Sequence, residues 1–453
     1  MFTQEDVKSA IIGFAVADAF GVPGEFIPRE KLQENPITEM AGYGSHDVPA
    51  GSWSDDTSMT LCTVESIAEK RGIDLDDIMQ RFCRWVDEGY MTPQGRIFDI
   101  GRTCMHAIGG YQRGQDVYHC GGGREYDNGN GSLMRILPVC FYNLAVDASP
   151  ADGFETIYRV SALTHAHDRA CLACAIYCEY LKALLFFPAE SKPTPVECVK
   201  RFEDKPQFEH FKRLASHDFG DLPMEEIRSS GYSVDSLEAA IWCFLNTDSY
   251  QDCVIKATNL GQDTDTIAAL AGGLAGAFYG YDAIPAQWVD TLIRKDEILT
   301  LCDNFYATLK DLHDETEATQ KEGNWAVVAF GDGYRRSMPV RKLAMAFERA
   351  LELEQLCIKS GETAARAEIM YALDIIRIYN NNGYEAGEEE LQRLTDYYRD
   401  VVTHPRIGDP RGEQPSQCRK CKLFVEDMQS CTRFPKRIPK EIFWGEHPCE
   451  GKK

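Results

Sequence analysis

Two short acidic segments, far apart in the chain, carry the residue types from which a metal-dependent hydrolase site is built. The first is Ser54–Thr57 (SDDT) and the second is Asp263–Thr266 (DTDT). Carboxylate and hydroxyl oxygens are hard ligands that suit Mg²⁺ or Mn²⁺ and suit zinc poorly. A pair of such ions could orient diol or phosphate oxygens and activate a water molecule.

Either segment alone has a simpler explanation as a helix N-cap. Ser, Thr and Asp accept hydrogen bonds from the free N–H groups of a first helical turn and suit its dipole. A cap needs one side-chain oxygen, whereas each segment offers two carboxylates and a hydroxyl. Four carboxylates brought together would be costly without a divalent cation. The two segments together therefore favour a metal site, although spacing alone does not show that they meet in the fold.

The elements that must position these segments are helices. Apolar residues recur at three and four residues over most of residues 1–310, most clearly in Ala162–Leu185 and Leu237–Leu245, and no βαβ rhythm occurs. We therefore expect an all-α fold. The stretch Ile267–Gly280 has a glycine at every fourth position from Gly272 to its end, which leaves one helix face nearly bare. We expect this helix to be buried centrally, with the second acidic segment at its mouth.

Composition narrows the function classes. The 453 residues include 48 Lys and Arg against 71 Asp and Glu, a net charge of −23, and 44% are hydrophobic. Wholesale disorder and polyanion binding over the whole surface are thereby excluded. The N-terminus has no secretory-signal pattern, and the apolar run Ile267–Tyr279 is too short to span a bilayer. With 17 cysteines read as reduced thiols, we expect a cytoplasmic protein without a membrane partner.

Five motifs occur in one order along the chain. They are Gly13–Glu25 (GFAVADAFGVPGE), Gly51–Thr57 (GSWSDDT), Phe98–Gly101 (FDIG), Gly129–Pro138 (GNGSLMRILP) and Gly261–Thr266 (GQDTDT). This ordered set resembles the ADP-ribosylglycohydrolase family, which includes the enzymes that release ADP-ribose from modified arginine or serine. The resemblance covers residues 5–310, and Thr164–His167 and Gly231–Val234 also fit it.

The resemblance implies an orthogonal array of helices with a dimetal centre in a cleft. In the family, two metal ions hold the hydroxyls of the distal ribose while water attacks its anomeric carbon. Asp56 is then the candidate for orienting or deprotonating that water, and Asp99 and Glu25 are candidates for proton transfer or for holding the ribose. The residues implied to hold two Mg²⁺ or Mn²⁺ ions are Ser54, Asp55, Asp56, Asp263, Asp265 and Thr266.

The resemblance also implies where the nucleotide binds. Glycine-rich backbone at residues 129–134 would let N–H groups approach an anionic diphosphate, with an ordinary turn as the alternative. His165 would contact substrate, and Tyr232 either stacks on adenine or is a core residue. Gln262 stands where many relatives have glycine, so its bulk could alter access or substrate choice. The substrate-binding residues expected on this basis are Gly129, Asn130, Gly131, Ser132, Leu133, Met134, His165 and Tyr232.

Residues 320–453 fall outside the resemblance. Polar and proline-rich segments predict boundaries that divide the chain into a catalytic domain (residues 1–315), a helical accessory region (325–403) and a cysteine-rich module (411–453). Amphipathic patterns predict accessory helices over Pro339–Lys359, Ala364–Tyr379 and Glu388–Val401.

The cysteine-rich module has the ligand spacing of a structural metal site. Its four thiols suit a Cys₄ zinc site, with an iron–sulfur cluster or free thiols as alternatives. The basic residues around them predict contact with nucleic acid or an acidic protein, unless they are simply a solvated surface. The predicted ligands are Cys418, Cys421, Cys431 and Cys449.

These features together predict a metal-dependent hydrolase that cleaves an N- or O-glycosidic bond to ADP-ribose. Its substrate would be an ADP-ribosylated protein or nucleic acid, with ADP-ribose as product. The alternatives are hydrolysis of a free derivative such as O-acetyl-ADP-ribose, and a module that binds ADP-ribose without turnover. All four acidic ligands are present, which favours the enzyme over the binding module.

Overall fold

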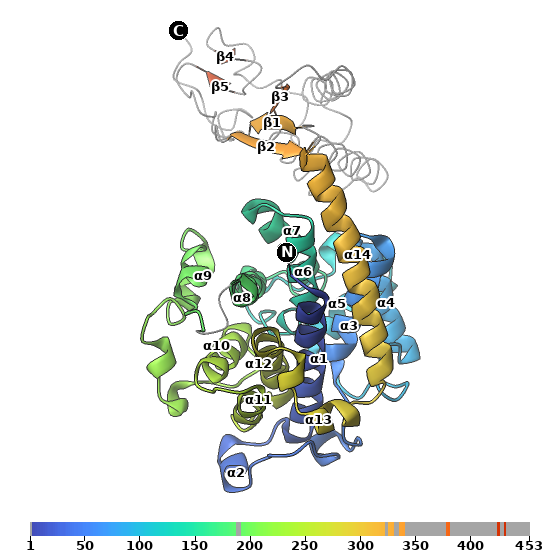
Figure 1. The fold of residues 1–453 in the computed structure, drawn as a ribbon, viewed down its shortest axis with the longest axis vertical. Helices are drawn as coiled ribbons and strands as arrows, with labels where there is room; N and C mark the ends of the chain where they lie inside the picture. Colours follow the sequence, from blue (N-terminus) through green and yellow to red (C-terminus); the bar gives the residue numbers. More distant parts are fainter. Residues whose placement is uncertain are drawn as a thin grey trace. The chain divides into compact units, whose positions relative to one another are not determined.

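The computed structural model describes residues 2–186 and 192–318 with their side chains, and the backbone of residues 319–321 and of five short strands beyond them. Among the described residues, every helix or strand that begins before residue 322 is a helix, which confirms the predicted all-α fold. Figure 1 shows α1 and α12 side by side with the other helices around them. In chain order the helices are α1 (Gln4–Gly21), α2 (Arg29–Glu34), α3 (Asp55–Lys70), α4 (Leu75–Glu88), α5 (Arg102–Gln112), α6 (Leu137–Ala145), α7 (Pro150–Ala162), α8 (Asp168–Phe186), α9 (Val196–Lys200), α10 (Ser233–Leu245), α11 (Tyr250–Thr258), α12 (Thr264–Tyr279), α13 (Ala286–Thr291) and α14 (Lys295–Lys321).

The helical run predicted from Ala162 to Leu185 is wrong at its start, because α7 ends at Ala162 and α8 begins only at Asp168. The connecting residues pair with Gly122 instead of continuing the helix. The Gly122 N–H donates to the carbonyl of Thr164 (2.9 Å), and the Ala166 N–H donates to the carbonyl of Gly122 (2.8 Å). Backbone groups that bond across to another segment in this way are no longer free for an intrahelical bond.

The contact between α1 and α12 is made backbone to backbone. A Cβ atom at Gly276 would lie 2.2 Å from the Ser9 carbonyl oxygen, and one at Gly272 would lie 2.6 Å from the Gly13 carbonyl oxygen. Only glycine allows this approach, which confirms that the small-residue face of α12 serves close packing. Gly280 was expected to share that face, but it lies just past the end of the helix with φ of 83° and meets no other atom within 4 Å.

Both central helices are buried. α1 is long and apolar enough to cross a membrane by length and composition, but 94% of its most apolar window is buried inside the protein. The hydroxyl of Tyr250 in α11 donates to the Gly13 carbonyl of α1 (2.6 Å), and that of Tyr177 in α8 donates to the Leu270 carbonyl of α12 (3.1 Å). The prediction that the second acidic segment stands at the mouth of a central helix is therefore confirmed.

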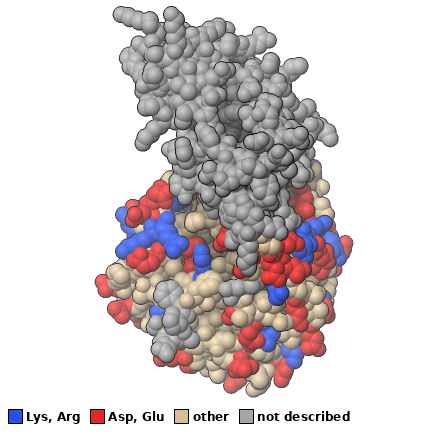
Figure 2. All heavy atoms as spheres, turned by 45° about the horizontal axis from the view of Figure 1, so that its top comes forward, with Lys and Arg blue, Asp and Glu red and all other residues tan. Residues whose placement is uncertain are grey.

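Charged side chains of both signs share the surface of the described residues. Figure 2 shows Asp and Glu accompanying Lys and Arg over the face in view. Three carboxylates of the acidic segments, those of Asp55, Asp56 and Asp265, lie inside the protein.

The chain divides into two compact units, Met1–Thr316 and Glu317–Lys453. In the second unit, the strand order is β2-β1-β3, and all pairs are antiparallel. A separate antiparallel pair joins β4 to β5. The strands are β1 (Trp325–Ala329), β2 (Arg335–Pro339), β3 (Arg377–Asn380), β4 (Phe424–Val425) and β5 (Ser430–Cys431).

These strands correct one expectation for the accessory region. The helix predicted over Ala364–Tyr379 is wrong at its end, where β3 begins at Arg377, because Ile378 and Tyr379 are residues that favour extended backbone. The rest of the predicted accessory helices falls almost wholly outside the described residues. The same holds for Cys418, Cys421 and Cys449 and for the side chain of Cys431, so the zinc site and the domain boundaries stay predictions.

Candidate active site

The first acidic segment begins α3, and both of its carboxylates are buried. Ser54 is the N-cap of this helix, and its hydroxyl accepts the Asp56 N–H (3.3 Å). The capping interpretation is therefore correct for Ser54. It does not account for the burial of Asp55 and Asp56, which are 6% and 1% exposed in the first turn.

Asp18, in the middle of α1, fixes the start of α3. Its carboxylate accepts the Ser54 N–H (3.0 Å), the Thr57 N–H (3.0 Å) and the Thr57 hydroxyl. Burial raises the pKa of Asp18 to about 6, and these hydrogen bonds oppose that rise because they favour the charged form. Asp18 is fully buried, so its role is to position the segment that carries Asp55 and Asp56.

The second acidic segment meets the first. The Thr266 hydroxyl donates to Asp56 Oδ1 (3.4 Å), across the gap between α12 and α3. Asp263 Oδ2 accepts the side-chain amide of Asn130 (2.8 Å), which ties the segment to the glycine-rich loop. The structure thus brings together the six residues that were expected to hold metal ions.

Two buried carboxylate oxygens in this cluster have no hydrogen-bond partner. Asp56 Oδ2 and Asp265 Oδ1 are buried and accept no hydrogen bond. Burial, followed by the charges of neighbouring carboxylates, raises the pKa of Asp55, Asp56 and Asp265 well above the ordinary value. Unpaired carboxylate oxygens in an all-oxygen donor set suit divalent cations such as Mg²⁺ or Mn²⁺. The residues present therefore fit the predicted pair of ions.

Glu25 and Asp99 lie beside the same cluster. One oxygen of Glu25 lies within 4.8 Å of a carboxylate oxygen each of Asp263 and Asp265, and Glu25 forms a second such group with His46 and Asp99. His46 hydrogen-bonds to Glu25 Oε2. Burial raises the pKa of Glu25 to about 7, although the bond to His46 lowers it. Both predicted proton-transfer residues are therefore positioned near the acidic segments.

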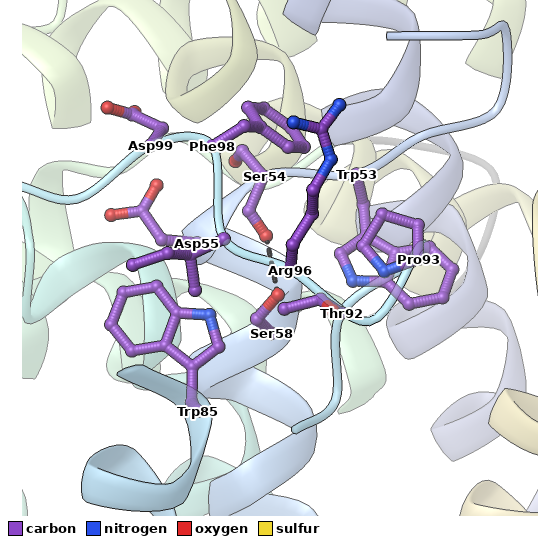
Figure 3. A pocket seen from close by; sticks show the side chains of 11 residues that line it. Trp53, Ser54, Asp55, Ser58, Trp85, Thr92, Pro93, Arg96, Phe98 and Asp99 are labelled. Carbon is purple, nitrogen blue, oxygen red and sulfur yellow. Dashed lines mark hydrogen bonds between the residues drawn. The ribbon is translucent and has the colours of Figure 1, made fainter. Parts of the chain in front are cut away.

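A narrow hollow opens next to Asp55 and Asp99. Figure 3 shows these two carboxylates on one side and the Arg96 guanidinium on the other. The indole rings of Trp53 and Trp85 and the ring of Phe98 also line the hollow. The Phe98 ring centre lies 5.1 Å from that of His46, so the lining of the hollow is in contact with the residue that hydrogen-bonds to Glu25.

The glycine-rich loop follows α5 and runs past the acidic cluster. The Asn130 N–H donates to the Gly231 carbonyl (3.0 Å), and Gly129 forms a β-bridge with Tyr232. Ser132 and Leu133 are fully buried, and the Ser132 hydroxyl accepts from the hydroxyl of Ser161 (2.8 Å). Their side chains face the core, so any substrate contact from this end of the loop is made by backbone groups.

His165 lies directly behind the loop. A Cβ atom at Gly131 would come within 2.7 Å of its ring, so a side chain larger than glycine does not fit there. Burial and the nearby charge of Arg135 lower the pKa of His165 to about 3, which keeps the imidazole neutral. Its Nδ1 is 2.9 Å from the Thr164 hydroxyl. Tyr232 is half-buried on the other side of the loop.

Two residues that the structure places at the site, Asp18 and His46, were not predicted from the sequence. A signal for Asp18 was present, because it is a lone carboxylate in a helix that is otherwise apolar. His46 comes from a polar glycine-containing loop, where its type and spacing give no indication of its contact with Glu25. Gln262 has φ of 65° and an exposed side chain next to Asp263, and its effect on access or substrate choice stays a prediction.

Comparisons with known proteins agree with this geometry. The family model ADP-ribosylglycohydrolase matches residues 2–320. The ADP-ribosylarginine hydrolase Tri1 of Serratia proteamaculans is 32% identical over 310 residues, which are 67% of this chain and 79% of that protein. The ADP-ribosyl-(dinitrogen reductase) glycohydrolase of Rhodospirillum rubrum is 32% identical over 295 residues, which are 64% of this chain and 90% of that protein.

A solved structure gives the same result for the fold. An ADP-ribosylglycohydrolase-related protein complex superposes with a TM-score of 0.57 at 32% identity, over 68% of this chain and 98% of that one. The matched region contains both acidic segments, the glycine-rich loop, Glu25 and Asp99. The chain therefore belongs to the ADP-ribosylglycohydrolase family and is a glycosyl hydrolase.

Proposed function

We propose that this chain removes ADP-ribose from arginine side chains of modified proteins in a reaction that requires two Mg²⁺ or Mn²⁺ ions. The observation that carries the metal requirement is the pair of buried carboxylate oxygens without partners, Asp56 Oδ2 and Asp265 Oδ1. The linkage to arginine is supported by two relatives at 31–32% identity that are named ADP-ribosylarginine hydrolases.

Six residues would hold the ions through oxygen atoms alone. When bound, the ions supply positive charge that holds ribose hydroxyls and lowers the pKa of a water molecule. Asp56 accepts the Thr266 hydroxyl of the second segment and has a free oxygen, so it would orient that water. The six are Ser54, Asp55, Asp56, Asp263, Asp265 and Thr266.

Proton transfer and nucleotide binding fall to neighbouring residues. Glu25, with a pKa of about 7, carries a proton part of the time near neutral pH and can donate or accept one, and half-buried Asp99 faces the same space. The N–H groups of residues 129–134 would hold the diphosphate, beside the neutral ring of His165 and the ring of Tyr232. The guanidine of the modified arginine leaves the ribose more readily when it is protonated, so an acid such as Glu25 beside the reacting bond would assist the reaction.

The proposal also covers the cellular compartment and the cysteine-rich module at residues 411–453. The 12 cysteines among the described residues are free thiols, which supports a reducing compartment such as the cytoplasm. For the basic cysteine-rich module we keep zinc at Cys418, Cys421, Cys431 and Cys449, and contact with nucleic acid or an acidic surface of the target protein.

The test is release of ADP-ribose from a panel of arginine-, serine- and nucleic-acid-linked substrates together with O-acetyl-ADP-ribose. Each is assayed with Mg²⁺, with Mn²⁺ and with EDTA. We expect metal-dependent release from the arginine-linked substrate. That release should be lost in Asp55→Ala/Asp263→Ala and kept in Asp290→Ala, whose carboxylate pairs with Lys295 on the surface. Release from another substrate would correct the linkage, and binding of ADP-ribose without any release would identify a binding module instead.

A further inference from the structure

A fixed carboxylate stands beyond the far end of the glycine-rich loop. Glu125 has a side chain that is 64% exposed, yet both of its oxygens are held. Oε1 lies 3.1 Å from Arg169 Nη1, and Oε2 lies 3.4 Å from His167 Nε2. Surface carboxylates in ion pairs are usually held loosely. An exposed carboxylate with a basic partner at each oxygen therefore requires an explanation.

The two residues that hold Glu125 are buried and rigid. The side chains of Arg169 and His167 are 9% and 10% exposed. His167 Nδ1 accepts the Arg169 N–H (3.1 Å), so the ring proton is on Nε2 and points at Glu125. Arg169 Nε donates to Gln207 (3.3 Å), which fixes the guanidinium further. An ionised carboxylate has about four lone-pair sites, and the ones that these donors leave free face solvent.

This group continues the line of contacts that starts at the metal ligands. Asp263 bonds Asn130, the Asn130 backbone bonds the carbonyl of Gly231, and Gly129 bridges Tyr232. The Arg169 guanidinium lies 5.7 Å from the centre of the Tyr232 ring. A ligand that extends from the carboxylate cluster along the loop therefore reaches Tyr232 first and Glu125 next.

ADP-ribose is such a two-ended ligand. If its reacting ribose lies at the acidic cluster and its diphosphate along the loop, as the proposed function requires, its adenosine falls beside Tyr232. We propose that Glu125 accepts the 2′- and 3′-hydroxyl groups of the adenosine ribose and excludes nucleotides that carry a phosphate there. This inference rests on the proposed function and names a selectivity that the function alone does not require.

The physical basis is charge and hydrogen-bond type. A carboxylate accepts two hydroxyl donors well and repels a phosphate dianion, and dinucleotide sites use an acidic residue against the 2′-hydroxyl in the same way. Arg169, on the buried side of Glu125, has the opposite preference, because its positive charge attracts a phosphate. If the charge of Glu125 is removed, the Arg169 guanidinium becomes free to pair with a phosphate.

The experiment measures binding by calorimetry, with the full chain and Mn²⁺. The two ligands are ADP-ribose and ADP-ribose that carries a phosphate on the 2′-hydroxyl of its adenosine ribose. We expect wild type to prefer ADP-ribose by about tenfold or more, as for a site with one misplaced like charge. Glu125→Gln removes the negative charge that repels the phosphate and should bring the two affinities close together. The gain for the phosphate should be smaller in Glu125→Gln/Arg169→Gln, which also lacks the guanidinium. Glu155→Gln is the control, since Glu155 is an exposed acid paired with Arg159 in α7.

The outcomes separate the two proposals. If wild type binds ADP-ribose but Glu125→Gln has the same preference as Glu155→Gln, the inference about Glu125 is overturned and the proposed function stands. If wild type does not bind ADP-ribose at all, the proposed function fails and this inference fails with it.

Discussion

Replacing Asp265 with Asn should stabilise the metal-free protein and remove the stabilisation that metal provides. Asp265 is 2% exposed, and its Oδ1 accepts no hydrogen bond. Burial first, and then the charges of Glu25, Asp56 and Asp263, raise its pKa well above 3.8. An unsatisfied buried polar group costs about 1–3 kcal/mol, and more when charged. We therefore expect Asp265→Asn to gain about 1–3 kcal/mol in EDTA at pH 7.

The sign of the pH dependence follows from the direction of the pKa shift. The carboxyl releases its proton at lower pH in the unfolded chain than in the folded one, so folding becomes less favourable as pH rises above 3.8. The advantage of Asp265→Asn should thus be small near pH 4 and grow as pH rises. Metal acts in the opposite sense: an ion at 100 times its Kd stabilises wild type by about 2.7 kcal/mol, and the variant lacks the charge to bind it.

The assay is thermal unfolding by circular dichroism, in EDTA and in Mn²⁺, at several pH values. A change of 1 kcal/mol corresponds to about 1–2 °C in a unit the size of Met1–Thr316. Asp290→Asn, at an exposed carboxylate, serves as the control and should leave both midpoints unchanged. The reasoning is refuted if Asp265→Asn is no more stable than wild type in EDTA, or if Mn²⁺ raises its midpoint as much as that of wild type.

Two further changes test the packing and the electrostatics away from the metal cluster. Gly276→Ala should lower the unfolding free energy by about 3 kcal/mol or more, as overpacking does, because its Cβ would lie 2.2 Å from the Ser9 carbonyl oxygen. Gly153→Ala in α7, whose Cβ would make only ordinary van der Waals contact with Asn143 (3.4 Å), should raise it slightly in the same urea titration. Glu238→Gln should stabilise the protein above pH 7 and have no effect below pH 4.5. Burial raises the Glu238 pKa from 4.5 to about 7, so the folded state bears a penalty once the unfolded carboxyl has ionised. Urea midpoints at pH 4 and pH 8 check this, and an equal gain at both would contradict it.

The sequence predicted those parts of the site whose functional residues are close together along the chain. The acidic segments were recognisable because each packs carboxylates and hydroxyls into four positions, and the glycine spacing in α12 predicted a close helix contact. Both are local patterns, and local patterns survive folding when tertiary packing supports them.

What the sequence did not predict depends on contacts between distant segments. The break between α7 and α8 arises because residues 164–166 pair with Gly122, and no propensity of those residues alone reports that pairing. The role of Asp18 depends on the backbone of Ser54 and Thr57 arriving at its carboxylate. The contact of His46 with Glu25 joins a short turn to the end of the 3₁₀ turn Val22–Gly24 that follows α1, and neither residue type requires the other.

The contact between α1 and α12 also has a consequence for synthesis. Asp18 and Glu25 are translated early, whereas α12 begins only at Thr264, so the carboxylates from the two ends of the catalytic region cannot meet until α12 has left the ribosome. A nascent chain that stops before that point carries half of the acidic cluster and lacks the glycine face against which α1 packs. Under the proposed function, no shortened N-terminal product that ends before α12 should bind the ion pair or cleave the glycosidic bond.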